Sequence, residues 1–133
     1  MLENSKINIK IKLAALWVSA LFCYIYGDYF QLYTPDKVNS LITGENNLDS
    51  PTKLLIASIV MAIPSIMVGA SIILKPKTNR ILNILFGSLF TLLMLFIGVN
   101  SITEWYSFYV FLAFLESIIT FLIVYYAWKW PKK

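Results

Sequence analysis

Four apolar stretches occupy most of this 133-residue chain, and each is long enough to cross a lipid bilayer. They run Leu13–Leu32, Thr52–Leu74, Ile81–Val99 and Trp105–Trp128. A helix needs about 20 apolar residues to cross a hydrocarbon core about 30 Å thick, and each stretch meets that length. We therefore predict an all-α integral membrane four-helix bundle.

The composition agrees with a membrane protein and with a single domain. Hydrophobic residues make up 59% of the chain and charged residues 14%, whereas soluble domains carry about 25% charged residues. The four spans use nearly the whole chain, so we expect residues 1–133 to form one four-span transmembrane domain. The first stretch is longer than a signal-peptide core and no Ala-x-Ala cleavage site follows it, so we expect it to be retained.

The charges predict an orientation in the membrane. Nine of the eleven basic residues gather at three places that share one side: Lys6, Lys10 and Lys12; Lys75, Lys77 and Arg80; Lys129, Lys132 and Lys133. Cytoplasmic segments are rich in Lys and Arg, so we expect both termini to be cytoplasmic. An even number of spans, such as four, also puts both termini on the same side. Because these residues lie at span ends and not on a shared face, the net charge of +4 does not indicate nucleic-acid binding.

The connections between the spans predict the topology. The two later connections are short, so spans two, three and four should run up and down, with spans two and three as antiparallel neighbours. In the long first connection, Pro35 is typical of a first helical position and Gly44 of a helix end. We predict a short surface helix lying flat on the outer side, with Val38, Leu41 and Ile42 on its apolar face. It is either a linker along the membrane or a lid over a cavity.

Small and polar residues indicate which face of each span points inward, because lipid is as apolar as a protein core. Each span carries such residues at helical spacing: Trp17, Ala20, Tyr24 and Asp28; Ser58, Ala62, Ser65 and Gly69; Asn83, Gly87 and Thr91; Tyr109, Ala113, Glu116 and Thr120. We assign these faces to the bundle interior. The alternative is that small residues only allow close packing.

Asp28 and Glu116 are the most unusual residues of the spans, because carboxyl groups within a bilayer are costly and usually mark function. Glu116 lies about 16 Å into its span, near the midplane, and Asp28 about 6 Å from the outer end. No Lys, Arg or His lies at either depth. We expect Glu116 to be protonated, with Ser65, Ser88 or Thr91 as partners, whereas Asp28 could ionise if water reaches it.

Three interpretations of the acids stay open. The two acids form a structural hydrogen bond between helices, anchor a hydrophobic or lipid-like ligand, or carry protons or cations. We favour a ligand site in an inter-helix cavity formed by Asp28, Glu116, Tyr24, Tyr109, Ser65 and Thr91. A structural or accessory subunit of a membrane complex is the second hypothesis, and a proton-coupled transporter the third.

Enzyme chemistry is disfavoured, because the chain has no histidine and its one cysteine, Cys23, lies in the first span as a packing residue. We expect no cofactor, no metal site and no intrachain disulfide. The predicted partners are the lipid bilayer and a hydrophobic small molecule or lipid, with no nucleic acid; a homo-oligomer stays open.

Four segments carry a resemblance to a known family: Tyr24-Ile25-Tyr26-Gly27-Asp28-Tyr29-Phe30, Ile63-Pro64-Ser65-Ile66-Met67-Val68, Thr78-Asn79-Arg80 and Tyr126-Ala127-Trp128-Lys129-Trp130. They resemble an uncharacterised bacterial family of four-helix membrane proteins with no known reaction. This resemblance implies a bacterial cytoplasmic membrane. Through Asp28, Pro35 and Pro64 the order of elements is also similar to the sigma-2 receptor and sterol isomerase group, whose cavity takes sterol-like ligands. The chain resembles DoxX-type four-helix membrane proteins in the same general way.

Overall fold

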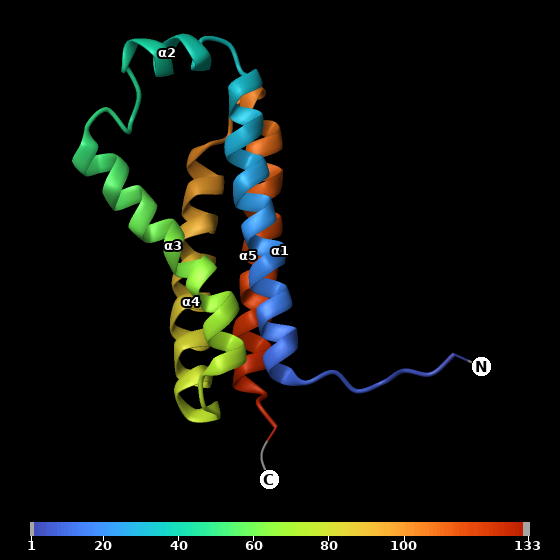
Figure 1. The fold of residues 1–133 in the computed structure, drawn as a ribbon. Helices are drawn as coiled ribbons and strands as arrows, with labels where there is room; N and C mark the ends of the chain where they lie inside the picture. Colours follow the sequence, from blue (N-terminus) through green and yellow to red (C-terminus); the bar gives the residue numbers. More distant parts are fainter. Residues whose placement is uncertain (1, 132–133) are drawn as a thin grey trace.

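The computed structural model describes residues 2–131, and every regular element in them is helical. Four long helices run side by side in Figure 1: α1 (Ile9–Phe30), α3 (Pro51–Ile73), α4 (Pro76–Asn100) and α5 (Ser107–Trp128). Each is long and apolar enough to cross a membrane. The prediction of an all-α protein with four candidate spans is confirmed, and the short helix α2 (Lys37–Thr43) makes the fifth helix.

The helices begin where local chemistry allows, and this extends some of them beyond the apolar stretches. The Ser50 hydroxyl accepts a hydrogen bond from the Lys53 main-chain N–H (3.1 Å), and Pro51 opens α3. Pro76 likewise opens α4 five residues before the predicted Ile81, because a proline at the first position needs no hydrogen bond. The helices α1 and α4 therefore begin before the apolar stretches Leu13–Leu32 and Ile81–Val99.

The first connection contains the short helix that the sequence predicted, with one boundary different. Gly44 ends it in the left-handed conformation (φ 80°), as expected. Its start was wrong: Pro35 precedes it, and Asp36 adopts a left-handed φ of 65° before the first helical residue. In Figure 1, α2 lies across one end of the bundle. Val38, Leu41 and Ile42 are all exposed there.

The helices α4 and α5 make the closest pair in the bundle. A Cβ atom added at Gly87 would lie 2.8 Å from Val124 Cγ2, and one at Gly98 would lie 3.2 Å from the Ala113 Cβ. Glycine at these positions lets the two backbones approach, as small residues do in membrane bundles. The α4 and α5 faces predicted from small residues are thus the faces that pack.

The helix α3 departs from the predicted arrangement. It packs mainly against α1, and it touches α4 much less, although a short turn joins the two. Its first six residues, 51–56, are all exposed, and Figure 1 shows this half leaning away from the other helices. The second and third spans are thus antiparallel and joined by a short turn, as predicted, but they make few contacts along their length, because the turn constrains only the end at which the helices meet.

A buried polar network holds α1, α3 and α4 together at the end where α3 does pack. Trp17 Nε1 donates to Asn83 Oδ1 (2.8 Å), and Ser71 Oγ donates to the same oxygen (3.3 Å). Asn83 Nδ2 donates to Asn79 Oδ1 (2.6 Å), and Asn79 Nδ2 donates to the Ser71 carbonyl (2.6 Å). All four side chains are fully buried. This Trp17–Asn83–Asn79–Ser71 cluster, here called the polar clasp, satisfies its donors internally, as a buried network must.

At the same end of the bundle, the Arg80 side chain of α4 binds the C-terminal end of α5. Arg80 Nε donates to the Ala127 carbonyl (3.1 Å), and an Arg80 terminal nitrogen donates to the Trp128 carbonyl (3.3 Å). The Arg80 guanidinium also lies 5.4 Å from the centre of the Trp128 ring. A positive charge is favourable at a helix C-terminus, where the last carbonyls lack partners. The polar clasp and the Arg80 hydrogen bonds therefore hold the helices together at this end of the bundle.

We expect Asn83→Ala to destabilise the protein by about 1–3 kcal/mol, because it leaves the buried Trp17 and Ser71 donors without their acceptor. Thermal unfolding of the purified protein in a mild detergent measures the loss. Asn100→Ala is the matched control, since Asn100 is exposed on the same helix and bonds only within it. An equal effect of both substitutions would contradict a special role for the clasp.

Candidate functional site

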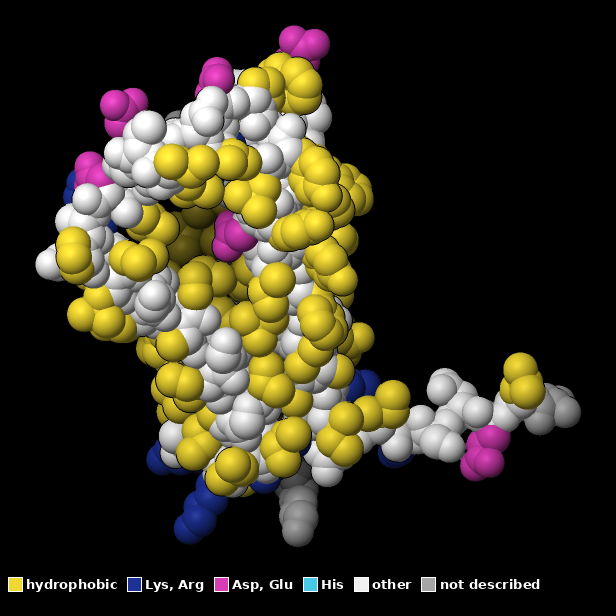
Figure 2. Space-filling model, turned by 45° about the horizontal axis from the view of Figure 1, so that its top comes forward, with side chains coloured by type: hydrophobic (Ala, Val, Ile, Leu, Met, Phe, Trp, Pro, Cys, Tyr) yellow, Lys and Arg dark blue, Asp and Glu magenta, His cyan; other side chains and the backbone are white. Residues whose placement is uncertain are grey.

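A cavity of about 250 Å³ lies between α1, α3, α4 and α5, towards the end where α3 leans away. Its walls are mostly apolar, and the four helices all contribute: Tyr24, Gly27, Asp28, Ala57, Val60, Met61, Leu93, Met94, Ile97, Tyr109, Ala113 and Glu116. Figure 2 shows the surface hollowed below α2, beside the leaning half of α3, with an acidic side chain at the edge of the hollow. The cavity therefore opens at the side of the bundle.

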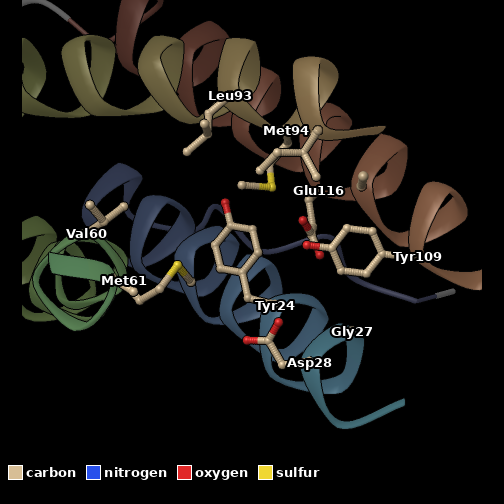
Figure 3. Close-up of a pocket in the computed structure, with 12 residues that line it drawn as sticks. Tyr24, Gly27, Asp28, Val60, Met61, Leu93, Met94, Tyr109 and Glu116 are labelled. Atoms are coloured by element: carbon tan, nitrogen blue, oxygen red, sulfur yellow. The ribbon is translucent and has the colours of Figure 1, made fainter. Parts of the chain in front are cut away.

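Glu116 is the buried acid of this cavity. It is 5% exposed, and α5 presents it to the space between the helices. Its main-chain oxygen accepts a hydrogen bond from Thr120 Oγ1 (3.0 Å), but its carboxyl group makes no hydrogen bond to any residue in the range 2–131. Figure 3 shows the carboxyl group and the Tyr109 side chain directed into the same space. A carboxyl group held in this way can receive a donor from a bound molecule.

Tyr24 supplies a second unpartnered polar group. Its side chain is 5% exposed, and its hydroxyl is buried with no hydrogen-bond partner in the described chain. The ring packs against Phe90, with 6.1 Å between ring centres, while the hydroxyl points towards Met94 in Figure 3. Buried tyrosine hydroxyls usually find a partner, so this one marks a place where a ligand atom would be stabilising.

Asp28 lies at the mouth of the same cavity. It is on α1, one turn beyond Tyr24, and unlike Glu116 it is exposed in the isolated chain. Gln31 Nε2 donates to Asp28 Oδ1 at a long distance of 3.5 Å. The two acids come from different helices and line one cavity, so a single molecule could contact both.

The structure brings together four of the six residues that the sequence predicted. Asp28, Glu116, Tyr24 and Tyr109 line the cavity, and Ser65 and Thr91 do not. Thr91 is bonded elsewhere: its hydroxyl donates to the Gly87 carbonyl and shares a 2.7 Å hydrogen bond with Thr120 Oγ1. Neither it nor Ser65 or Ser88 is a partner of the Glu116 carboxyl group within the described residues.

The prediction that Ser65 faces the bundle interior was wrong, and Ser58 on the same predicted face of α3 also points outward. Ser58 and Ser65 are exposed, and nothing lies within 4 Å of a Cβ added at Gly69. The buried face of α3 consists instead of Pro64, Met67 and Ser71. A serine hydroxyl can bond to its own helix, as Ser58 Oγ does to the Leu54 carbonyl (2.9 Å), so serine does not have to face inward.

The apolar walls of the cavity could not be found by sequence reasoning. Val60, Met61, Leu93 and Met94 look the same in the sequence as residues that face lipid. A signal for Met94 did exist in its spacing from Gly87, Phe90 and Gly98, which are also buried on α4. Within residues 2–131, no three His, Cys, Asp or Glu side chains lie close enough together to hold a metal ion.

Four packed apolar helices with this sequence make the chain a multi-pass membrane protein. The chain belongs to a protein family described as a family of unknown function (DUF6326), whose sequence model matches residues 3–133. No curated protein and no solved structure matches the chain. The likeness to the sigma-2 receptor and sterol isomerase group, and that to DoxX-type proteins, stay predictions.

We expect Tyr24→Phe to leave the stability of the empty protein unchanged or to raise it by up to about 1 kcal/mol, because it removes a buried hydroxyl that has no partner. Thr120→Val is the matched control, since it removes a hydroxyl bonded to Thr91 and should cost about 1 kcal/mol. Thermal unfolding in detergent compares the two. A loss for Tyr24→Phe as large as for Thr120→Val would mean that the hydroxyl has a structural partner.

Proposed function

We propose that this protein binds a hydrophobic or lipid-like small molecule in the cavity between its four long helices. The observation that carries the proposal is the Glu116 carboxyl group, which is buried at the wall of an apolar cavity without a hydrogen bond from residues 2–131. An acid inside a bilayer costs roughly 2.5–3.5 kcal/mol even on the gentler scales. A structural role would offset that cost with a bond to a neighbouring helix, and here the carboxyl group faces open space.

The walls suit an apolar occupant. Apart from Asp28, Glu116 and two tyrosine hydroxyls, the lining consists of aliphatic side chains, methionines and one glycine. Ligand sites combine such walls with a few placed polar groups that fix orientation. The volume of about 250 Å³ lies just below the usual range of about 300–1,000 Å³ for drug-sized ligands. The cavity therefore suits one end of a molecule whose remainder extends through the opening.

An accessory subunit of a membrane complex is the second candidate, and the outer face of α3 favours it. Ser58 and Ser65 are exposed there, and Gly69 has open space before it. Small residues on an outward face let another helix approach closely. A stable complex with a different protein after gentle extraction, unaffected by Glu116→Gln, would favour this role. A proton-coupled transporter would instead show pH-driven flux in liposomes that Glu116→Gln abolishes.

We also propose that the protein lies in a bacterial cytoplasmic membrane with both termini inside. Figure 2 shows most of the visible Lys and Arg side chains at one end of the helices and most of the acids towards the other, and the Lys and Arg bias is what sets orientation. In a Cys23→Ser background, a membrane-impermeant maleimide applied to intact cells should label Glu45→Cys and leave Lys77→Cys unlabelled. Labelling of Lys77→Cys alone would reverse the orientation.

The ligand proposal is tested by thermal shift of the purified protein against a panel of lipids and apolar amines. At least one compound should raise the unfolding temperature of the wild type, and Glu116→Gln or Asp28→Asn should reduce that shift by half or more. Glu104→Gln is the matched control, because Glu104 is exposed and does not line this cavity. A panel that gives no shift, or shifts identical in all variants, would refute the proposal.

A further inference from the structure

The charges around the cavity do not balance. Two of its twelve lining residues are acids and none is Lys, Arg or His. The nearest basic side chain along the first connection is Lys37, which lines a separate outer hollow with Gln31 and Asn47. That hollow shares Ile97 and Tyr109 with the cavity, so the two spaces adjoin, but Lys37 is outside the acidic one. Lys37 acts electrostatically on Asp28 from that neighbouring space, whereas within the described residues no basic side chain lines the cavity itself or acts on Glu116.

The hydrogen-bonding capacity of the cavity is also one-sided. The Glu116 carboxyl group has no donor from residues 2–131, and Asp28 receives one long contact from Gln31. We expect Glu116 to be protonated in the empty cavity, but a cation beside a carboxyl group favours its ionised form, and two ionised carboxyl groups offer four acceptor oxygens. An occupant that satisfied them would need several donors and a positive charge. A protonated amine has three donors and no acceptor, which complements this wall.

The aromatic side chains add to the same preference. The rings of Tyr24 and Tyr109 line the cavity beside the acids, and Figure 3 shows Tyr24 between Asp28 and Met94, with Tyr109 next to Glu116. A cation over a tyrosine face is attracted by the ring's negative charge distribution, more strongly when water is excluded. Carboxyl groups and aromatic faces together make a site for an ammonium group.

The remaining wall suits an alkyl chain. Ala57, Val60 and Met61 of α3 face the cavity from one side, and Leu93, Met94 and Ile97 of α4 from another. The exposed first six residues of α3 leave the cavity open at the side of the bundle, and because α3 is a candidate membrane span, lipid tails would surround this opening. A tail can therefore leave the cavity into the bilayer, with no need to fit within about 250 Å³.

We infer that the ligand is an apolar amine, whose protonated head lies between Asp28 and Glu116 and whose alkyl tail runs against α3 and α4. This inference rests on the proposed function and narrows it to a charge class. A fatty acid would bring a third carboxyl group next to two others, which is repulsive at close range. A neutral alcohol brings one donor to four acceptors, so it would bind without engaging both acids.

A matched series of twelve-carbon compounds tests the charge class: dodecylamine, dodecanol and dodecanoic acid. Binding is measured by calorimetry on protein in nanodiscs of neutral phosphatidylcholine, so that lipid charge does not attract the amine. Dodecylamine should bind the wild type roughly tenfold or more tightly than dodecanol, since charge-assisted hydrogen bonds are about twice as strong as neutral ones. Dodecanoic acid should bind most weakly.

Variants assign the preference to the cavity. Glu116→Gln should reduce the ratio of amine to alcohol affinity at least tenfold, whereas Glu104→Gln should leave it unchanged. Ala57→Phe, which fills the cavity from α3 without changing a charge, should weaken amine and alcohol alike. This variant keeps the test valid if Glu116→Gln fails to fold.

The outcomes separate the inference from the proposed function. If dodecanol binds as tightly as dodecylamine and Ala57→Phe abolishes both, the cavity takes a neutral apolar ligand: the proposed function stands and the amine class is wrong. An amine preference that persists in both Glu116→Gln and Ala57→Phe would place amine binding outside the cavity and overturn the inference. If none of the three compounds binds, the amine inference is overturned, and the thermal shift with the lipid panel decides the proposed function.

Discussion

The hydrogen bond from Trp17 to Asn83 is the interaction on which the arrangement of the bundle depends. It joins the first and the third span at a place where hydrocarbon offers no competing partner, and Asn79 and Ser71 extend it to the second span. Membrane helices gain little from apolar contact with each other, because lipid tails are equally apolar. Polar groups and close-packed small residues therefore decide which helices stay together.

The clasp acts at one end of α3 only, and this asymmetry produces the cavity. Ser71 is near the C-terminal end of α3 and within the network, whereas residues 51–56 at the other end are exposed. Meanwhile α4 and α5 are held along their length by contacts at Gly87 and Gly98. With three helices fixed and one held at a single end, the space beside α3 cannot close. Asp28 and Glu116 line this space because α1 and α5 both border it.

The sequence predicted the spans and three of the four interior faces, and it failed on α3 for a physical reason. Asn83, Trp17 and Thr120 carry polar atoms that lose hydrogen bonds in lipid, so their burial follows from their chemistry. The Ser58 hydroxyl donates a hydrogen bond within its own helix, so the side chain can face either lipid or the bundle interior. The methionines that do face inward on α3 are as stable in lipid as in protein. No residue type on α3 except Ser71 distinguished inside from outside.

The same reasoning explains why the acids, and not the apolar walls, indicated the candidate site. A lipid-facing leucine and a cavity-lining leucine have nearly equal free energy, so neither leaves a mark in the sequence. A carboxyl group has a strong preference for any polar partner, and its position is informative even when that partner is absent. Asn79 shows the converse: it is fully buried, and its side-chain nitrogen donates to the Ser71 and Leu74 carbonyls. The clasp is satisfied largely by its own members and holds the helices, whereas the Glu116 carboxyl group lacks a partner among residues 2–131, which is why the proposed ligand site is centred on it.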